Sequence, residues 1–113
     1  PNRVDYIVTK TALMGLARAI ALETQKEPNI TVNAICPGAV KTPAAKKRVA
    51  ALAEEKGISI EEATTEFVSG RQQSGRFIEP SQVGALIAFL CSDAAKEITG
   101  ASIPIDDAWT ISP

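Results

Sequence analysis

The apolar run at residues 30–36 is the feature that most constrains the fold of this chain. The run is short, rich in β-branched residues and almost continuously apolar, and Pro37 and Gly38 end it. This pattern is typical of a strand in a parallel sheet that is covered on both faces. A second predicted strand spans residues 101–105, where Pro104 has no N–H to donate and therefore favours a sheet edge.

Helical patterns precede and separate the two predicted strands. Residues 5–23 are apolar almost all round, which predicts a helix that is buried on several sides. Residues 79–90 repeat apolar side chains at helical spacing. Strands that alternate with helices predict a parallel sheet with right-handed crossovers, which is an α/β fold. Two strands make a poor sheet, so we expect other strands to be missing from these 113 residues.

A helical insertion at residues 43–76 stands between the first strand and the last helix. Charged and apolar residues alternate up to Gly57, as in an amphipathic helix. Ser59 stands three residues before Glu62, which is the spacing of a capping box, and predicts the start of a second short helix. The polar stretch 70–75 is typical of a mobile loop.

The composition excludes several classes of function. With a net charge of -1, the chain gives no support for binding to nucleic acid or to a membrane surface. It has no signal peptide and no transmembrane run, so we expect a cytoplasmic protein. It has no histidine, which excludes a histidine-based zinc cluster and a Ser-His-Asp triad. Cys36 and Cys91 lie in apolar runs and are expected to be buried, reduced thiols.

A tyrosine and a lysine four residues apart carry the clearest chemistry in the sequence. On a helix, Tyr6 and Lys10 lie on one face, and a nearby ammonium favours phenolate over phenol. Tyr6 is therefore a candidate general acid/base. The alternative interpretation is that Tyr6 is an aromatic core residue and Lys10 a solvated lysine beside it, because this arrangement has the same spacing. Arg3 can share this face and anchor a carboxylate, although an arginine in a first helical turn is more often solvated.

The loop after the first strand is a second candidate site. In open parallel sheets, ligands bind beyond the carboxyl ends of the strands. Gly38 lets backbone come close to a ligand there, and Thr42 presents a hydroxyl group. An ordinary strand-to-loop turn explains the same residues. Asp106 and Asp107 are adjacent acids near the end of the chain, but no third ligand is near them in sequence, so we expect no metal site.

Taken in order, these motifs resemble the C-terminal half of a short-chain dehydrogenase/reductase. The ordered set is Tyr-x-x-x-Lys on an Ala/Gly-rich helix, a strand ending Asn-Ala-Ile-Cys-Pro-Gly, then Thr-Pro, and Ile-Thr-Gly ahead of Asp-x-x-Trp. The resemblance spans essentially the whole chain. It implies that residues 1–113 are the C-terminal portion of one domain with a Rossmann-like, doubly wound parallel sheet whose N-terminal strands are absent. Residues 43–76 would be its substrate lid.

Within this family the chain is most similar to the 3-hydroxybutyrate dehydrogenases, while the 3-oxoacyl-carrier-protein reductases share much of the pattern. The resemblance implies a small-molecule oxidoreductase that uses NAD or NADP, with NAD favoured, and acts on a short 3-hydroxy acid or its 3-oxo acid. Tyr6 would be the acid/base. Lys10 would stabilise its phenolate and bind the nicotinamide ribose, so that both residues also contact the cofactor.

The resemblance also assigns the remaining site residues. Pro37 and Gly38 would shape the nicotinamide pocket, and the backbone of Val40 with the side chain of Thr42 would hold the carboxamide. Arg48, together with the arginine at position 3, would contact the substrate. The 3-hydroxybutyrate enzymes tend to have a lysine where Arg3 stands and a glutamine where Arg48 stands. This difference leaves the exact substrate open.

Two further departures from the family pattern bear on structure and activity. Asp107 and Ala108 stand where family members commonly have two glycines, and losing a left-handed glycine costs of order 1 kcal/mol or more. The glycine-rich cofactor loop and the catalytic serine of the family are absent from this sequence. We therefore expect the 113 residues alone to be inactive. The alternative is a truncated, non-catalytic oligomerisation module, since the first helix would form half of a dimer interface, usually within a tetramer.

Overall fold

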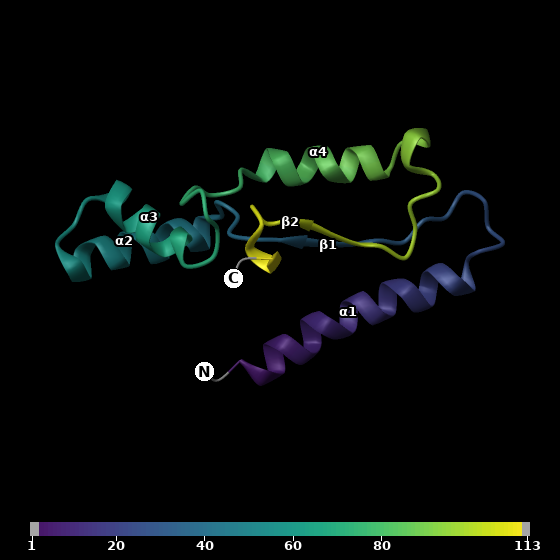
Figure 1. The fold of residues 1–113 in the computed structure, drawn as a ribbon, viewed down its shortest axis with the longest axis horizontal. Coiled ribbons are helices and arrows are strands. Elements are labelled where there is room, and N and C mark those ends of the chain that lie inside the picture. Colours follow the sequence, from purple (N-terminus) through teal and green to yellow (C-terminus); the bar gives the residue numbers. More distant parts are fainter. Residues whose placement is uncertain (1–2, 112–113) are drawn as a thin grey trace. The chain divides into compact units, whose positions relative to one another are not determined.

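The computed structural model describes residues 3–111, in which helices alternate with two parallel strands (Figure 1). The elements are α1 (Val4–Glu23), β1 (Ala34–Pro37), α2 (Pro43–Lys56), α3 (Ile60–Ser69), α4 (Pro80–Leu90), η1 (Asp93–Ala95), β2 (Ser102–Ile105) and η2 (Trp109–Ile111). β1 and β2 pair directly, which confirms the prediction of an α/β fold. The chain divides into two compact units, one running to Ile35 and resuming at 87–103, the other comprising 36–86 and the segment from Pro104 onward.

In the first unit, α1 has the predicted length but not the predicted burial. Among its residues only Ala17 and Ala21 are buried, and Leu22 is 68% exposed. Near the end of the helix, a Cβ added to Gly100 would lie 3.5 Å from the Cβ of Ala21, which is ordinary van der Waals contact. The apolar pattern indicates that the helix surface is suited to packing against a partner. It does not indicate which element is that partner.

The first strand starts later than predicted because a side chain takes over part of the pairing. The amide of Asn33 donates to the carbonyl of Ile98 at 2.7 Å and accepts from the N–H of Ala101 at 3.1 Å. Backbone bonds flank this amide, since the N–H of Gly100 donates to the carbonyl of Val32 at 2.7 Å and the N–H of Ala34 donates to the carbonyl of Ala101 at 2.8 Å. The strand therefore covers Ala34–Pro37 rather than residues 30–36.

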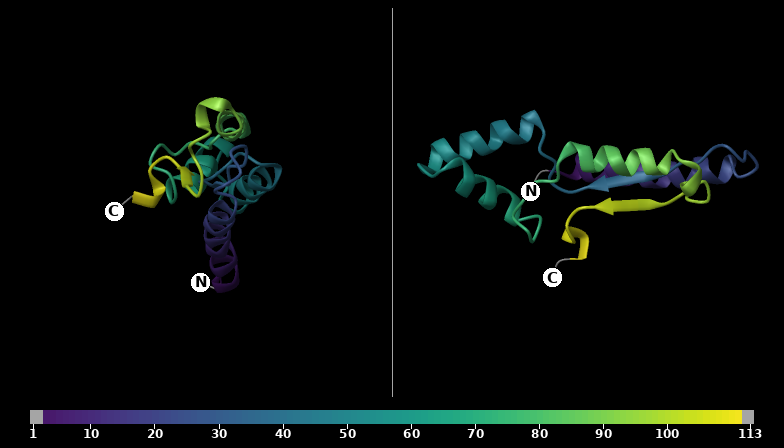
Figure 2. Two further views of the ribbon diagram at one scale, coloured as in Figure 1. Left: turned by 90° about the vertical axis from the view of Figure 1, so that its right-hand side faces the viewer. Right: turned by 90° about the horizontal axis from the view of Figure 1, so that it is seen from above.

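In the second unit, α2 and α3 form a helical pair joined by a short connection (Figure 2). The hydroxyl of Thr42 accepts from the N–H of Ala45 at 3.1 Å and caps α2, which ends at Gly57 in the left-handed conformation with φ of 64°. The predicted capping box is present at the start of α3. Ser59 Oγ accepts from the N–H of Glu62 at 3.1 Å, and the Glu62 carboxylate accepts from the N–H of Ser59 at 2.9 Å.

A small apolar core holds the helical pair together. Its buried members are Val49, Ala53 and Ala63, with Leu52, Ile58, Phe67 and Phe77 packed around them. Within residues 3–111, no helix is long and apolar enough to cross a membrane. Neither cysteine forms a disulfide, and the expectation that Cys91 is buried is wrong, because it follows the last residue of α4 on an exposed turn.

The turn after β2 has the backbone conformation that glycine favours. Asp107 has φ of 52° and Ala108 has φ of 63°, as the resemblance implied for this position. Aspartate tolerates the left-handed region better than alanine does. The Asp107 carboxylate also accepts from the N–H of Ser74 at 2.7 Å, and this hydrogen bond lowers the pKa of Asp107 below its ordinary value.

Replacing Ala108 with glycine should stabilise the protein. The left-handed backbone strains an alanine Cβ, so the change Ala108→Gly is expected to raise the free energy of unfolding by about 1 kcal/mol. Urea denaturation measures the effect. The matched control is Ala50→Gly on the exposed face of α2, which should destabilise by about 1 kcal/mol. If both variants changed the free energy of unfolding in the same direction, the strain argument would be contradicted.

The capping box should make the stability of α3 depend on pH. The backbone N–H of Ser59, followed by its hydroxyl, lowers the pKa of Glu62, so the ionised carboxylate stabilises the folded helix. This contribution is present above the unfolded-state pKa of Glu62 and is lost as the pH falls through the lower, folded-state pKa.

We therefore expect Glu62→Gln to speed hydrogen exchange in α3 at neutral pH, with the difference from wild type vanishing in acid. Glu61→Gln is the control, because Glu61 lies in the same helical turn but outside the capping box. Identical exchange in the two variants at neutral pH would rule out the capping box as the cause.

Candidate active site

The predicted acid/base pair lies on one face of α1, as the i, i+4 spacing requires. The Nζ of Lys10 is 5.8 Å from the centre of the Tyr6 ring, and the Cζ of Arg3 is 5.5 Å from it. Tyr6, the only tyrosine of the chain, is 54% exposed. The first unit therefore places two cations beside one accessible phenol, a face that suits an anionic ligand.

The remaining predicted cofactor contacts lie together in the second unit. Pro37 ends β1, and residues 38–42, called the 38–42 loop below, connect it to α2. The N–H of Gly38 donates to the carbonyl of Ile105 at 3.0 Å, which extends the pairing with β2. On the other side, the N–H of Lys41 donates to the carbonyl of Ile78 at 2.9 Å. The loop is therefore fixed from two directions.

The backbone of Val40 is the part of this loop with an unused donor. A parallel bridge pairs Val40 with Ile78, and its two hydrogen bonds run from the N–H of Ile78 to the carbonyl of Ala39 and from the N–H of Lys41 to the carbonyl of Ile78. Between residues 3 and 111, no acceptor is recorded for the N–H of Val40 itself. Since a half-buried N–H needs a partner, this donor fits a ligand carbonyl such as a nicotinamide carboxamide.

Thr42 has a structural role that the sequence analysis did not predict. Its hydroxyl oxygen caps α2 by accepting from the N–H of Ala45. A hydroxyl has one donor and two acceptor positions, so capping leaves its O–H able to donate to a ligand. Both Thr42 and Pro37 are exposed. Arg48, the predicted substrate contact on α2, is also exposed and belongs to the second unit, whereas Arg3 belongs to the first.

Sequence reasoning missed Gln72, which contacts the 38–42 loop directly. Its Oε1 accepts from the N–H of Ala39, and its side chain is only 1% exposed. The stretch 70–75 was predicted to be a mobile polar loop, and that prediction is wrong at Gln72. Nothing in a polar segment distinguishes a buried glutamine from a solvated one, because the distinction depends on a partner 33 residues away.

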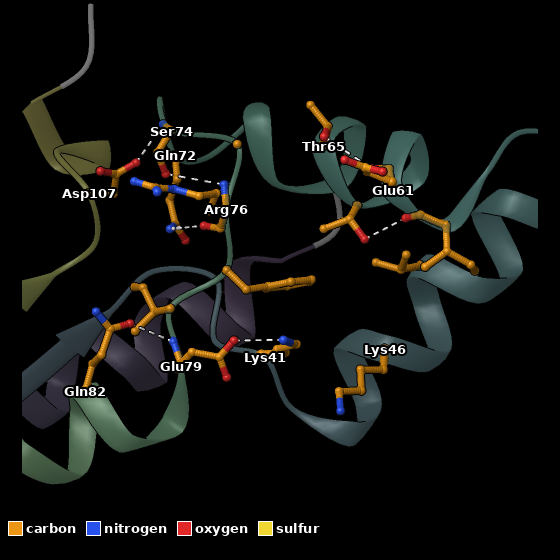
Figure 3. Close-up of a pocket in the computed structure, with 16 residues that line it drawn as sticks. Lys41, Lys46, Glu61, Thr65, Gln72, Ser74, Arg76, Glu79, Gln82 and Asp107 are labelled. Carbon is orange, nitrogen blue, oxygen red and sulfur yellow. Dashed lines mark hydrogen bonds and ion pairs between the residues drawn. The ribbon is translucent and has the colours of Figure 1, made fainter.

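A cavity of about 890 Å³ opens between the helical pair and residues 72–82 (Figure 3). Both signs of charge line it, and one pair is joined by the ion pair between Lys41 and Glu79 at 2.8 Å. Of the residues predicted to bind substrate or cofactor, none lines this cavity. In the described part of the chain, no three His, Cys, Asp or Glu residues are placed to hold a metal ion.

The chain resembles known proteins along almost its whole length. A family model described as enoyl-(acyl carrier protein) reductase matches residues 1–110. The chain is 42% identical over 104 residues to the D-beta-hydroxybutyrate dehydrogenase of Cupriavidus necator, an alignment that covers 92% of this chain and 40% of that protein. The chain thus spans well under half the length of this relative.

Solved structures give the same result. A short-chain dehydrogenase family protein from Francisella tularensis matches with a TM-score of 0.85 and 33% identity, over 99% of this chain and 46% of that one. The L-sorbose reductase of Gluconobacter frateurii, solved with NADPH and L-sorbose, matches with a TM-score of 0.85 and 30% identity, over 96% and 41%. With the family match, these likenesses show that the chain belongs to the short-chain dehydrogenase/reductase family.

Proposed function

We propose that this chain is the C-terminal portion of an NAD- or NADP-dependent oxidoreductase that interconverts a short 3-hydroxy acid and its 3-oxo acid. The observation that carries the proposal is the cluster of Arg3, Tyr6 and Lys10 on one face of α1. It supplies, within about two helical turns, a proton-transfer group, a cation beside that group and a second cation suited to a carboxylate.

Tyr6 performs the proton transfer in this proposal. In the oxidation direction, its phenolate oxygen takes the proton of the substrate hydroxyl while the carbinol C–H leaves as hydride; in reduction its O–H returns the proton to the new alkoxide oxygen. Lys10 supplies the cation beside this phenol, with its Nζ 5.8 Å from the centre of the Tyr6 ring. A bound nicotinamide would accept or supply the hydride.

The 38–42 loop holds the cofactor in this proposal. The N–H of Val40 would donate to the carboxamide oxygen, and the hydroxyl of Thr42 would supply a second donor. The fixed backbone of the loop supports this role, because donors that are already in place lose little freedom on binding. Both NAD and NADP fit these contacts, and the resemblance to the 3-hydroxybutyrate enzymes makes NAD the first to test.

The substrate class rests on charge. Arg3 and Arg48 each offer a guanidinium that binds a carboxylate with two parallel hydrogen bonds. The name of the relative from Cupriavidus necator, D-beta-hydroxybutyrate dehydrogenase, supports a hydroxy acid. A homo-oligomer, a dimer or tetramer, is the proposed assembly, because α1 leaves many apolar side chains exposed, among them Val4, Ile7, Val8, Leu13, Leu16 and Leu22.

Tyr6→Phe in the full-length protein should remove most of the activity and leave cofactor binding intact. The change deletes only the oxygen that transfers the proton, and general acid/base catalysis contributes roughly 10²- to 10⁴-fold. We therefore expect kcat for 3-hydroxybutyrate oxidation to fall by about that factor, with the dissociation constant for NADH unchanged. Steady-state absorbance of the reduced cofactor and fluorescence titration measure the two quantities.

Two lysine variants and the 113 residues alone accompany this experiment. Lys47→Met removes a lysine from exposed α2 and should leave kcat unchanged, whereas Lys10→Met should lower it. The 113 residues alone should give no turnover, because the sequence contains neither the family's glycine-rich loop nor its serine. Turnover that survives Tyr6→Phe would remove Tyr6 from the mechanism.

A further inference from the structure

Gln72 is one of the two largest fully buried side chains among the described residues. A buried amide is costly unless both its oxygen and its nitrogen find partners. Here both partners are backbone groups. Oε1 accepts from the N–H of Ala39, and Nε2 donates to the carbonyl of Arg76 at 2.9 Å. Figure 3 shows the second of these bonds beside Arg76. The side chain therefore acts as a bridge between two stretches of backbone.

The bridge fits the 38–42 loop closely. A Cβ added to Gly38 would lie 2.8 Å from the Oε1 of Gln72 and 3.1 Å from the Cα of Asp106. No real Cβ tolerates the first distance, so Gly38 is the residue that lets the amide reach the loop. This contact gives Gly38 a packing role, apart from its proposed place in the nicotinamide pocket.

Gln72 is itself anchored to the end of the helical pair. Its own N–H donates to the carbonyl of Val68, in the last turn of α3, at 2.8 Å. Its carbonyl accepts from the N–H of Gly75 at 3.2 Å, which closes the turn that leads to Arg76. One residue thus joins the end of α3, the following turn and the loop that follows β1.

We propose that Gln72 is a positioning residue that fixes the 38–42 loop so that the N–H of Val40 faces the nicotinamide carboxamide. This inference rests on the proposed function and deepens it. Gln72 does not touch the cofactor in this account. It satisfies the N–H of Ala39, which belongs to the peptide unit just before the one that carries the Val40 N–H. The carbonyl of that second unit already accepts from the N–H of Ile78 at 2.9 Å, so Gln72 and Ile78 together hold the two peptide units in place.

An apolar side chain of the same size cannot replace the amide. Ala39 is 8% exposed, so its N–H would be left without an acceptor in a site that water hardly reaches. The loop would then relax toward another acceptor, and the neighbouring peptide would turn with it. The expected consequence is weaker binding of the nicotinamide half of the cofactor, with no change at its adenosine half.

Gln72→Met in the full-length protein tests this inference, with Gln73→Met at the exposed neighbouring position as the matched control. Fluorescence and calorimetric titrations give dissociation constants for NADH and for ADP-ribose, which lacks the nicotinamide. We expect Gln72→Met to weaken NADH binding about tenfold, equivalent to about 1.4 kcal/mol, and to leave ADP-ribose binding within twofold of wild type. Gln73→Met should alter neither ligand.

The outcomes separate this inference from the proposed function. If wild-type protein binds no nicotinamide cofactor, the proposed function fails and the inference fails with it. If wild type binds and turns over but Gln72→Met matches Gln73→Met for NADH, only the inference is overturned. Equal losses for NADH and ADP-ribose would mean a general structural role and would also overturn it.

A second variant covers the case in which Gln72→Met does not fold. Gln72→Glu has nearly the same shape and keeps an acceptor for the N–H of Ala39, but it loses the donor to the carbonyl of Arg76. We expect a loss of NADH affinity of a few fold with ADP-ribose binding retained. Wild-type affinity for NADH in this variant, together with unchanged hydrogen exchange at Ala39, would contradict the positioning role.

Discussion

Hydrogen bonds fix the 38–42 loop on both sides, and the rest of the second unit depends on this constraint. The N–H of Gly38 continues the pairing with β2, and the bridge to Ile78 holds the other side. The side chain of Gln72 accepts a hydrogen bond from the N–H of Ala39. These bonds use the N–H groups of Gly38, Ala39 and Lys41, so the N–H of Val40 is the donor that a ligand carbonyl could accept from.

The same loop controls both ends of the helical pair. Thr42 ends the loop and caps α2, while Gln72 follows α3 and returns to the loop through its side chain. A shift in the loop therefore moves the start of one helix and the residue that follows the other. In the proposed enzyme, this linkage connects the segment over the substrate to the residues that hold the cofactor.

Local patterns predicted the parts of the fold whose causes are local. The capping box at Ser59 and the end of α2 at Gly57 follow from residues within a few positions of one another, whereas the strain at Ala108 was expected from the family resemblance. The late start of β1 and the burial of Gln72 were missed, since each depends on a side chain that bonds backbone far away in sequence. The juxtaposition of Tyr6 and Lys10 was predictable from spacing alone. Their role as an acid/base pair stays a proposal, and it rests on the ordered set of motifs.

For the apolar side chains of α1, the sequence pattern predicted burial that the structure does not show. Its composition predicted burial, yet most of its apolar side chains are exposed among the described residues. Exposed apolar side chains indicate that a surface is suited to a partner, but they do not identify the partner. The family supplies the proposal of a second subunit, which the sequence pattern alone does not distinguish from further strands and helices of the same domain.

Residue-resolved hydrogen exchange of the full-length protein, with and without NAD, tests the central claim most directly. The claim is that the loop is held before the cofactor arrives and that Val40 is the donor left for it. The amides of Ala39 and Lys41 should be protected in both states, while the amide of Val40 should exchange quickly alone and become protected with NAD. Protection of Val40 without cofactor, or none with it, would contradict the account.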